Sequence, residues 1–400
     1  MRYEIRNHFN RAAFVFEQDE SCLFHFEMNK RILSIDALRG LDMLILCGGA
    51  TVLSLWLEYS AGDATPAWLM QQFNHAEWGG DFTCWDLVMP LFIFITGASM
   101  PFAFAKYREK GGEHWRWGTT WRVTRRVALL FILGMLVQGG LASAVPQRMS
   151  LFCNTLQAIA EGYLITAAVL MFCSKLRGQI ITAATCMVVY WALLRFVPYQ
   201  GQPGGLFMPD NNLAIYIDHY LEGKLQDGTP YSWILTALSF GALTLMGSIC
   251  GSLIREKQGQ ATVIKISAAG VACLAAACLL EYDTPLIKHI FTTTAVLWSG
   301  GWCMLLLALF HLVFDCCGAV TAKCAYPLQV FGCNALLAYL LIEIHGPHGH
   351  NLWWGIAHPL FYGISARCEA AAALVHAGLS LALLWLFLCF LYRHKAFLRV

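Results

Sequence analysis

Charged residues are scarce in this 400-residue sequence. Only 13% of the residues are Asp, Glu, Lys or Arg, roughly half the share usual in a soluble globular chain, and 58% are hydrophobic. The net charge is +2 and the sequence lacks a basic segment of domain size, which excludes a nucleic-acid-binding domain. The 16 cysteines form no CxxC pair and lack metal-ligand spacing, so they are read as small apolar packing residues. We therefore expect no metal site.

Apolar runs occupy most of the chain instead. Their lengths, roughly 18 to 25 residues, match what a helix needs to cross about 30 Å of hydrocarbon. They predict an all-α integral membrane protein, a bundle of about ten transmembrane helices. The predicted spans are 35–58, 82–105, 123–142, 151–173, 179–197, 231–254, 261–281, 289–313, 326–345 and 371–392.

The distribution of Lys and Arg predicts the orientation. With the N-terminus on the cytoplasmic side, the inner connections and termini carry 20 of the 27 basic residues and the outer connections carry 4. Because basic flanks are retained in the cytoplasm, we expect both termini to be cytoplasmic. The long connections 59–81, 198–230 and 346–370 then lie outside, where an external substrate site is expected.

The first 30 residues lack the apolar core of a signal peptide. Residues 1–30 are read as a cytoplasmic segment, or as a start assigned too far upstream of Met28. Residues 31–400 form the membrane domain. The histidine-rich stretch at 345–351, HGPHGHN, is read as loop polarity or as the lining of a substrate mouth rather than as a zinc site, because its Gly and Pro spacing fixes no ligand face.

Two polar clusters interrupt the first two spans. Asp36, Arg39 and Asp42 lie at the cytoplasmic end of the first span, where a buried ion pair either serves function or fixes one helix against another. The segment NHAEWGGDFTCWD leads into the second span, with His75 just outside the membrane and Asp86 about three helical turns deeper. A histidine at a wet mouth can act as a base or a nucleophile, although a loop histidine is usually plain surface.

Several motifs carry a family resemblance. They are RxxSxDxxRG in the first span, HxxWxG before the second, DLxxPxFxFxxGxS within it and NTLQAIAEGYL in the fourth, with weaker echoes in NLAIYID, KHIFTTTAVLWSGG and FGCNALLAYLL. Together they resemble the heparan-α-glucosaminide N-acetyltransferase family and its bacterial relatives, over nearly the whole membrane portion.

The resemblance implies an acetyl-CoA-dependent acyltransferase in the bacterial inner (plasma) membrane. Such an enzyme moves an acetyl group from cytoplasmic acetyl-CoA to the amine of glucosamine, or of a terminal glucosamine of an oligosaccharide, on the outer side. Its catalytic histidine corresponds to His75, as nucleophile or general base, and a homodimer in contact with membrane lipids is implied. The sequence departs from the animal enzymes at Gly48, Gly49 and Ala50, where they carry an asparagine. It also has no large lumenal domain before the first span, which favours a small acceptor over a long polysaccharide.

Polar and basic side chains supply the candidate binding residues. For acetyl-CoA they are Arg116, Arg122, Arg125, Arg126, Arg39, Asn154 and Gln157. For the acceptor they are Asn74, Glu77, Trp78, Asp86, Asp218 and Asn334. Positive-inside topology explains the arginines equally well, and helix-helix hydrogen bonding explains the intramembrane amides. Two other functions stay open, a secondary transporter of a sugar or amino sugar and a membrane O-acyltransferase of envelope glycans.

Overall fold

The computed structural model describes residues 32–111, 115–141, 149–173, 175–226, 228–257, 259–317, 323–344, 351–365 and 369–398. The expected N-terminal segment 1–30 and the histidines of the 345–350 stretch lie outside them. The described residues form helices and no strand, with two isolated β-bridges in one loop. The helices long and apolar enough to cross a membrane are Leu33–Ala61, Trp85–Glu109, Thr155–Phe172, Leu176–Phe196, Ala237–Glu256, Gln260–Leu280, Thr293–Cys316 and Ala371–Arg393.

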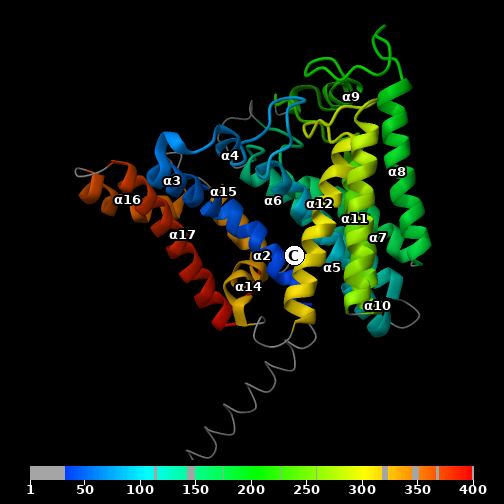
Figure 1. Ribbon diagram of the computed structural model, residues 1–400. Coiled ribbons are helices and arrows are strands. Elements are labelled where there is room, and N and C mark those ends of the chain that lie inside the picture. The colour runs from blue at the N-terminus through cyan, green and yellow to red at the C-terminus, as the bar shows by residue number, and fades with distance from the viewer. Residues whose placement is uncertain are drawn as a thin grey trace, which may run out of the picture.

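The protein is therefore a multi-pass, all-α membrane bundle (Figure 1). Each of the ten predicted spans corresponds to a helix or a helix pair. The predicted third span is α6 (Trp115–Val137), which starts well before the expected residue 123 and carries four arginines. The predicted ninth span is broken at Asn334 into α14 (Tyr326–Cys333) and α15 (Ala335–Glu343), because Asn334 has a ψ of 33°.

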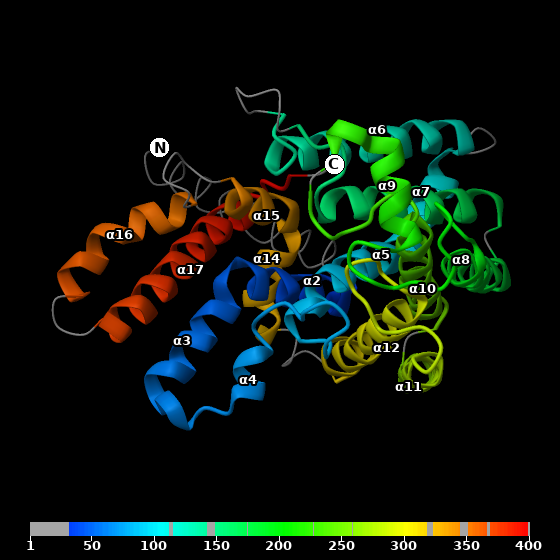
Figure 2. The same cartoon turned by 90° about the horizontal axis from the view of Figure 1, so that it is seen from above.

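The last outer connection is not only a loop, contrary to the sequence prediction. Within it α16 (Leu352–Ser365) forms a helix that packs along α17 (Glu369–Arg393). The view from above places α16, α17 and α3 (Ala50–Ala61) on one side of the bundle, away from α8 (Leu176–Phe196) and α11 (Gln260–Leu280) (Figure 2).

Glycines let the central helices touch backbone to backbone. Where α5 (Val88–Gly111) crosses α10 (Ala237–Glu256), a Cβ on Gly97 would lie 1.9 Å from the carbonyl oxygen of Thr244. A Cβ on Gly247 would lie 1.9 Å from the carbonyl oxygen of Phe94. Close approach at small residues is the usual way in which helices pack inside a membrane, where burial in lipid drives no association.

A second crossing pairs α2 (Leu33–Leu44) with α14. A Cβ on Gly40 would lie 1.8 Å from the carbonyl oxygen of Leu328, and one on Gly332 would lie 2.1 Å from that of Asp36. Beyond this contact α2 passes into a π-helix, η1 (Ile45–Gly49), in which Gly48 has a φ of 120°. The positive φ requires glycine and redirects the chain into α3.

The other end of α2 is fixed by a second π-helix. At the end of α12 (Thr293–Phe310), η7 (His311–Cys316) carries Asp315, whose carboxylate accepts a hydrogen bond of 3.1 Å from the backbone N–H of Leu33. His311 Nδ1 lies 2.7 Å from the same carboxylate. An acidic group at a helix N-terminus satisfies its orphan N–H groups and complements its dipole.

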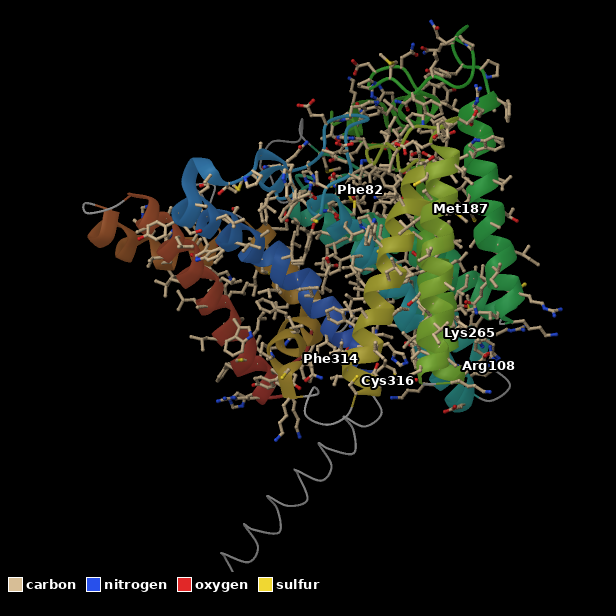
Figure 3. The ribbon with its side chains drawn as sticks, in the orientation of Figure 1. Phe82, Arg108, Met187, Lys265, Phe314 and Cys316 are labelled. Carbon is tan, nitrogen blue, oxygen red and sulfur yellow. The ribbon has the colours of Figure 1, made fainter. Side chains whose placement is uncertain are left out.

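The loops that build the candidate site gather at one end of the bundle (Figure 1). Figure 3 shows Phe82 near this end and Arg108 and Cys316 near the opposite one. We name them the outer end and the inner end, after the expected orientation.

Candidate functional site

The loop before α5 folds back on itself and brings His75 to the start of that helix. The backbone N–H of Trp85 donates to the carbonyl oxygen of Gln72 at 3.0 Å, and the Thr83 hydroxyl donates to the carbonyl oxygen of Asn74 at 2.7 Å. Gly79, with a φ of 70°, allows the tight turn between these contacts. As a result two residues eleven positions apart meet, and His75 Nδ1 lies 2.9 Å from Asp86 Oδ1. The expectation that Asp86 lies about three helical turns deeper than His75 was wrong, because the intervening residues form a folded loop and not a helix.

Asp86 is the centre of the network and is 1% exposed. Its Oδ2 accepts hydrogen bonds from the backbone N–H of Ala76 at 3.0 Å and of Thr83 at 3.3 Å. Its Oδ1 faces both His75 and the ammonium group of Lys288, which is 2.9 Å away. Such a set of donors holds a buried carboxylate in its ionised form.

Lys288 is the residue that the sequence analysis missed. It comes from the loop before α12, is 7% exposed, and places its Nζ 3.0 Å from His75 Nδ1. Burial lowers the pKa of Lys288, and the neighbouring charge of Asp86 opposes that effect. The imidazole of the next residue, His289, contacts the rings of Trp78 and Tyr231, with centroids 5.1 and 4.8 Å away. These contacts anchor the loop that carries Lys288.

The hydrogen bonds also assign the tautomer of His75. The indole N–H of Trp85 donates to His75 Nε2 at 3.1 Å, and because an indole has no acceptor, Nε2 must hold a lone pair. A neutral His75 therefore carries its proton on Nδ1 and donates it to Asp86. The Lys288 ammonium, which has no acceptor, then donates to Asp86 Oδ1 and only touches His75 Nδ1. The side chain of His75 is 53% exposed, so Nε2 is the nitrogen available to a substrate that displaces Trp85.

A cavity of about 340 Å³ begins at this network. His75, Lys288 and Trp85 line it, together with Tyr231 and Glu343 from two other elements. The other lining residues are apolar or aromatic, such as Leu46, Phe92 and Trp233, or neutral and polar, namely Gln138, Asn154, Thr155 and Thr229. Ligand sites commonly combine such walls with a few convergent polar groups.

The predicted acceptor residues only partly meet at this cavity. Asp86 belongs to the network, whereas the indole N–H of Trp78 donates to the carbonyl oxygen of Phe207 at 2.8 Å and so supports the loop around it. Asn74 and Glu77 are exposed and are not among the residues that line the cavity.

Asp218 and Asn334 have structural partners away from His75. The Asp218 carboxylate accepts hydrogen bonds from the backbone N–H groups of Trp233 at 2.6 Å and Ile234 at 3.2 Å, just before α10. Burial raises the pKa of Asp218 to about 6, although these bonds oppose the rise. Asn334 joins the break between α14 and α15 to the C-terminal segment through Ala396 and Leu398.

Of the predicted acetyl-CoA residues, Asn154 lines the cavity and Gln157 supports it. The two form a capping box at the start of α7 (Thr155–Phe172), which satisfies the first N–H groups of that helix. The spacing N-x-x-Q in NTLQ is the sequence signal for this role. Arg39 pairs instead with Asp36 at 3.5 Å in α2. The sequence predicted a buried ion pair here, whereas the two side chains are 25% and 18% exposed.

The four predicted arginines of α6 lie in the part of the bundle that leads to the inner end. The guanidinium carbons of Arg116, Arg122 and Arg126 lie 5.8, 5.0 and 4.5 Å from the ring centroids of Phe172, Tyr107 and Tyr163. Arg125 is exposed. Among the described residues that line the cavity there is no arginine, so the structure does not bring this group and His75 into one site.

No protein-family model matches the chain, and no curated protein matches it. Within the described residues, no group of three or more His, Cys, Asp or Glu side chains could hold a metal ion. The arrangement at the outer end is thus an oriented histidine, a buried acid and a buried lysine on the wall of an aromatic cavity, which is suited to acid-base or nucleophilic chemistry.

Proposed function

We propose that the protein is a transmembrane acetyltransferase that moves the acetyl group of cytoplasmic acetyl-CoA to the amine of an amino sugar at the outer end. The observation that supports this function best is the contact of His75 with both Asp86 and Lys288 in the cavity wall. The motif resemblance reaches the same histidine independently. The bacterial inner membrane and a homodimer belong to the proposal through the resemblance alone.

His75 acts through Nε2 in this proposal. The acceptor amine takes the place of the indole N–H of Trp85 beside Nε2. Nε2 then either removes a proton from the amine or itself attacks the thioester carbonyl. Asp86 holds the Nδ1–H tautomer and stabilises the imidazolium that forms. Lys288 balances the charge of Asp86, and because it also lines the cavity, its ammonium group is the candidate to stabilise the oxyanion of the acetyl group.

The cavity lining supports an amino sugar as the acceptor. Trp85, Tyr231 and Trp233 offer flat apolar faces for the C–H face of a sugar ring, and the Glu343 carboxylate attracts an ammonium group. A volume of about 340 Å³ is near the lower limit of ligand sites and fits one sugar residue better than a long chain. The arginines of α6 are the candidate partners of the phosphates of CoA at the inner end.

Acetyl-CoA consumption by purified protein in proteoliposomes tests the function. We expect free CoA to appear only when glucosamine or a similar amine is present. His75→Ala should lower the rate on the order of 100- to 10,000-fold, as loss of a positioned base or nucleophile does. His219→Ala, which alters an exposed histidine of α9 (Leu213–Glu222), is the matched control and should keep the wild-type rate. A normal rate in His75→Ala would refute the mechanism.

The same preparation separates the two rival functions. Counterflow of an unmodified sugar that needs no acetyl-CoA would indicate a secondary transporter, for which a buried intramembrane acid such as Asp42 is typical. Analysis of the product distinguishes N-acetylation from transfer to a hydroxyl group of an envelope glycan.

A further inference from the structure

Asp42 is a buried acid that has no partner among the residues that the structure describes. It lies in the N-terminal half of the first membrane-spanning segment and is 0% exposed, and neither of its carboxylate oxygens has a hydrogen-bond partner among the described residues. The sequence placed it in one cluster with Asp36 and Arg39, but Arg39 pairs with Asp36 alone. Within the described part of the chain, no cation forms an ion pair with Asp42.

The position of Asp42 connects it to the cavity. Leu46, which lines the cavity, follows it by four residues, so the two side chains share one face of the helix at a rise of about 6 Å. Cys47 lies within electrostatic range of both Asp42 and the cavity residue Glu343. Asp42 is therefore about one helical turn beyond the cavity wall, on the side toward the inner end.

The apolar surroundings of Asp42 determine the charge of its carboxyl group. An isolated carboxylate in an apolar interior costs far more free energy than its neutral form, so a carboxyl group in this position keeps its proton. The same argument applies to a CoA thiolate that the proposed reaction would form at the Leu46 wall of the cavity, since it would also be an unsolvated anion. A neutral acid beside an unstable anion is the arrangement that transfers a proton.

We propose that Asp42 donates a proton to the thiolate that leaves acetyl-CoA, an inference that rests on the proposed acetyltransferase function. As the amine nitrogen bonds to the acetyl carbon, the C–S bond breaks and its electron pair stays on sulfur. The Asp42 O–H proton moves to that sulfur and gives neutral CoA thiol. The amine gives one proton to His75 Nε2, and transfer of that proton to the Asp42 carboxylate restores both groups for the next turnover.

The test compares two acetyl donors in Asp42→Asn, which keeps the shape of the side chain but has no acidic proton. With acetyl-CoA, kcat should fall on the order of 100-fold while KM changes little, because a general acid is lost. With 4-nitrothiophenyl acetate, whose thiol is acidic enough to leave without protonation, the rate should stay close to that of the wild type. Asp42→Leu, which suits the apolar site, should show the same selectivity if Asp42→Asn folds poorly.

An infrared difference spectrum supplies a readout without turnover. Wild type minus Asp42→Asn at neutral pH should contain the C=O stretch of a protonated carboxylic acid, and absence of that band would overturn the proposal. Equal losses with both donors would overturn it as well, with the proposed function intact. If the wild type transfers acetyl groups from neither donor, the proposed function fails and this inference fails with it.

Discussion

The pair of Asp86 and Lys288 should show strong energetic coupling. Both side chains are almost fully buried and their charged atoms are 2.9 Å apart. Lys288→Met leaves a buried carboxylate without its cation, and Asp86→Asn leaves a buried ammonium group without its anion. Removing one partner of a buried pair costs about 3 to 5 kcal/mol, whereas removing both leaves no isolated charge. We therefore expect the double variant to lose at least about 2 kcal/mol less than the sum of the single losses.

A double-mutant cycle measures this coupling, with unfolding in mixed micelles followed by tryptophan fluorescence. The matched control is Arg195 and Asp283, which also lie 3.0 Å apart but are 40% and 39% exposed. Exposed pairs are worth about 0 to 1 kcal/mol, so a nearly equal distance should give a much smaller coupling there. Equal coupling in the two pairs, or additivity within about 0.5 kcal/mol at Asp86 and Lys288, would refute the reasoning.

Two further predictions concern stability. Gly97→Ala and Gly247→Ala should each cost about 1 to 3 kcal/mol or more, because each new Cβ meets a backbone carbonyl, whereas Gly378→Ala, which meets nothing within 4 Å, should be neutral or slightly stabilising in the same unfolding assay. The pKa of Asp218, raised by burial from 3.8 to about 6, means that the folded protein binds more protons than the unfolded chain between about pH 4 and 6. Stability should therefore rise by up to about 3 kcal/mol as the pH falls through that window. A pH series of thermal unfolding should show that Asp218→Asn lacks this part of the dependence, and an unchanged slope would contradict the assignment.

The helices were predictable because apolar length and charge are local properties. Runs such as 261–281 agree with α11 to within a residue at each end. The break at Asn334 and the π-helix at Gly48 were not predictable, since both depend on the packing of distant segments. The prediction of α6 was also too short at its start, because the helix begins with arginines and the prediction used apolar runs alone.

The site was predictable only where its residues are neighbours in sequence. His75 and Asp86 belong to one motif, so both were named as candidates from the sequence. Lys288 was counted only as an outer basic residue, because nothing in a single sequence links two loops that meet through folding. Asn154 and Gln157 were assigned to acetyl-CoA, although N-x-x-Q ahead of an apolar run also signals a helix cap, and the cap is what their hydrogen bonds form.

The long separation of Lys288 from Asp86 has a consequence for biogenesis. The two residues are 202 positions apart, so the ribosome has passed most of the membrane domain to the insertion machinery before the lysine is made. Until then Asp86 has no cation, and a nascent chain that stalls before residue 288 presents an uncompensated acid at the membrane surface. The arrival of one loop thus completes the ion pair at the outer end, late in the synthesis of the chain.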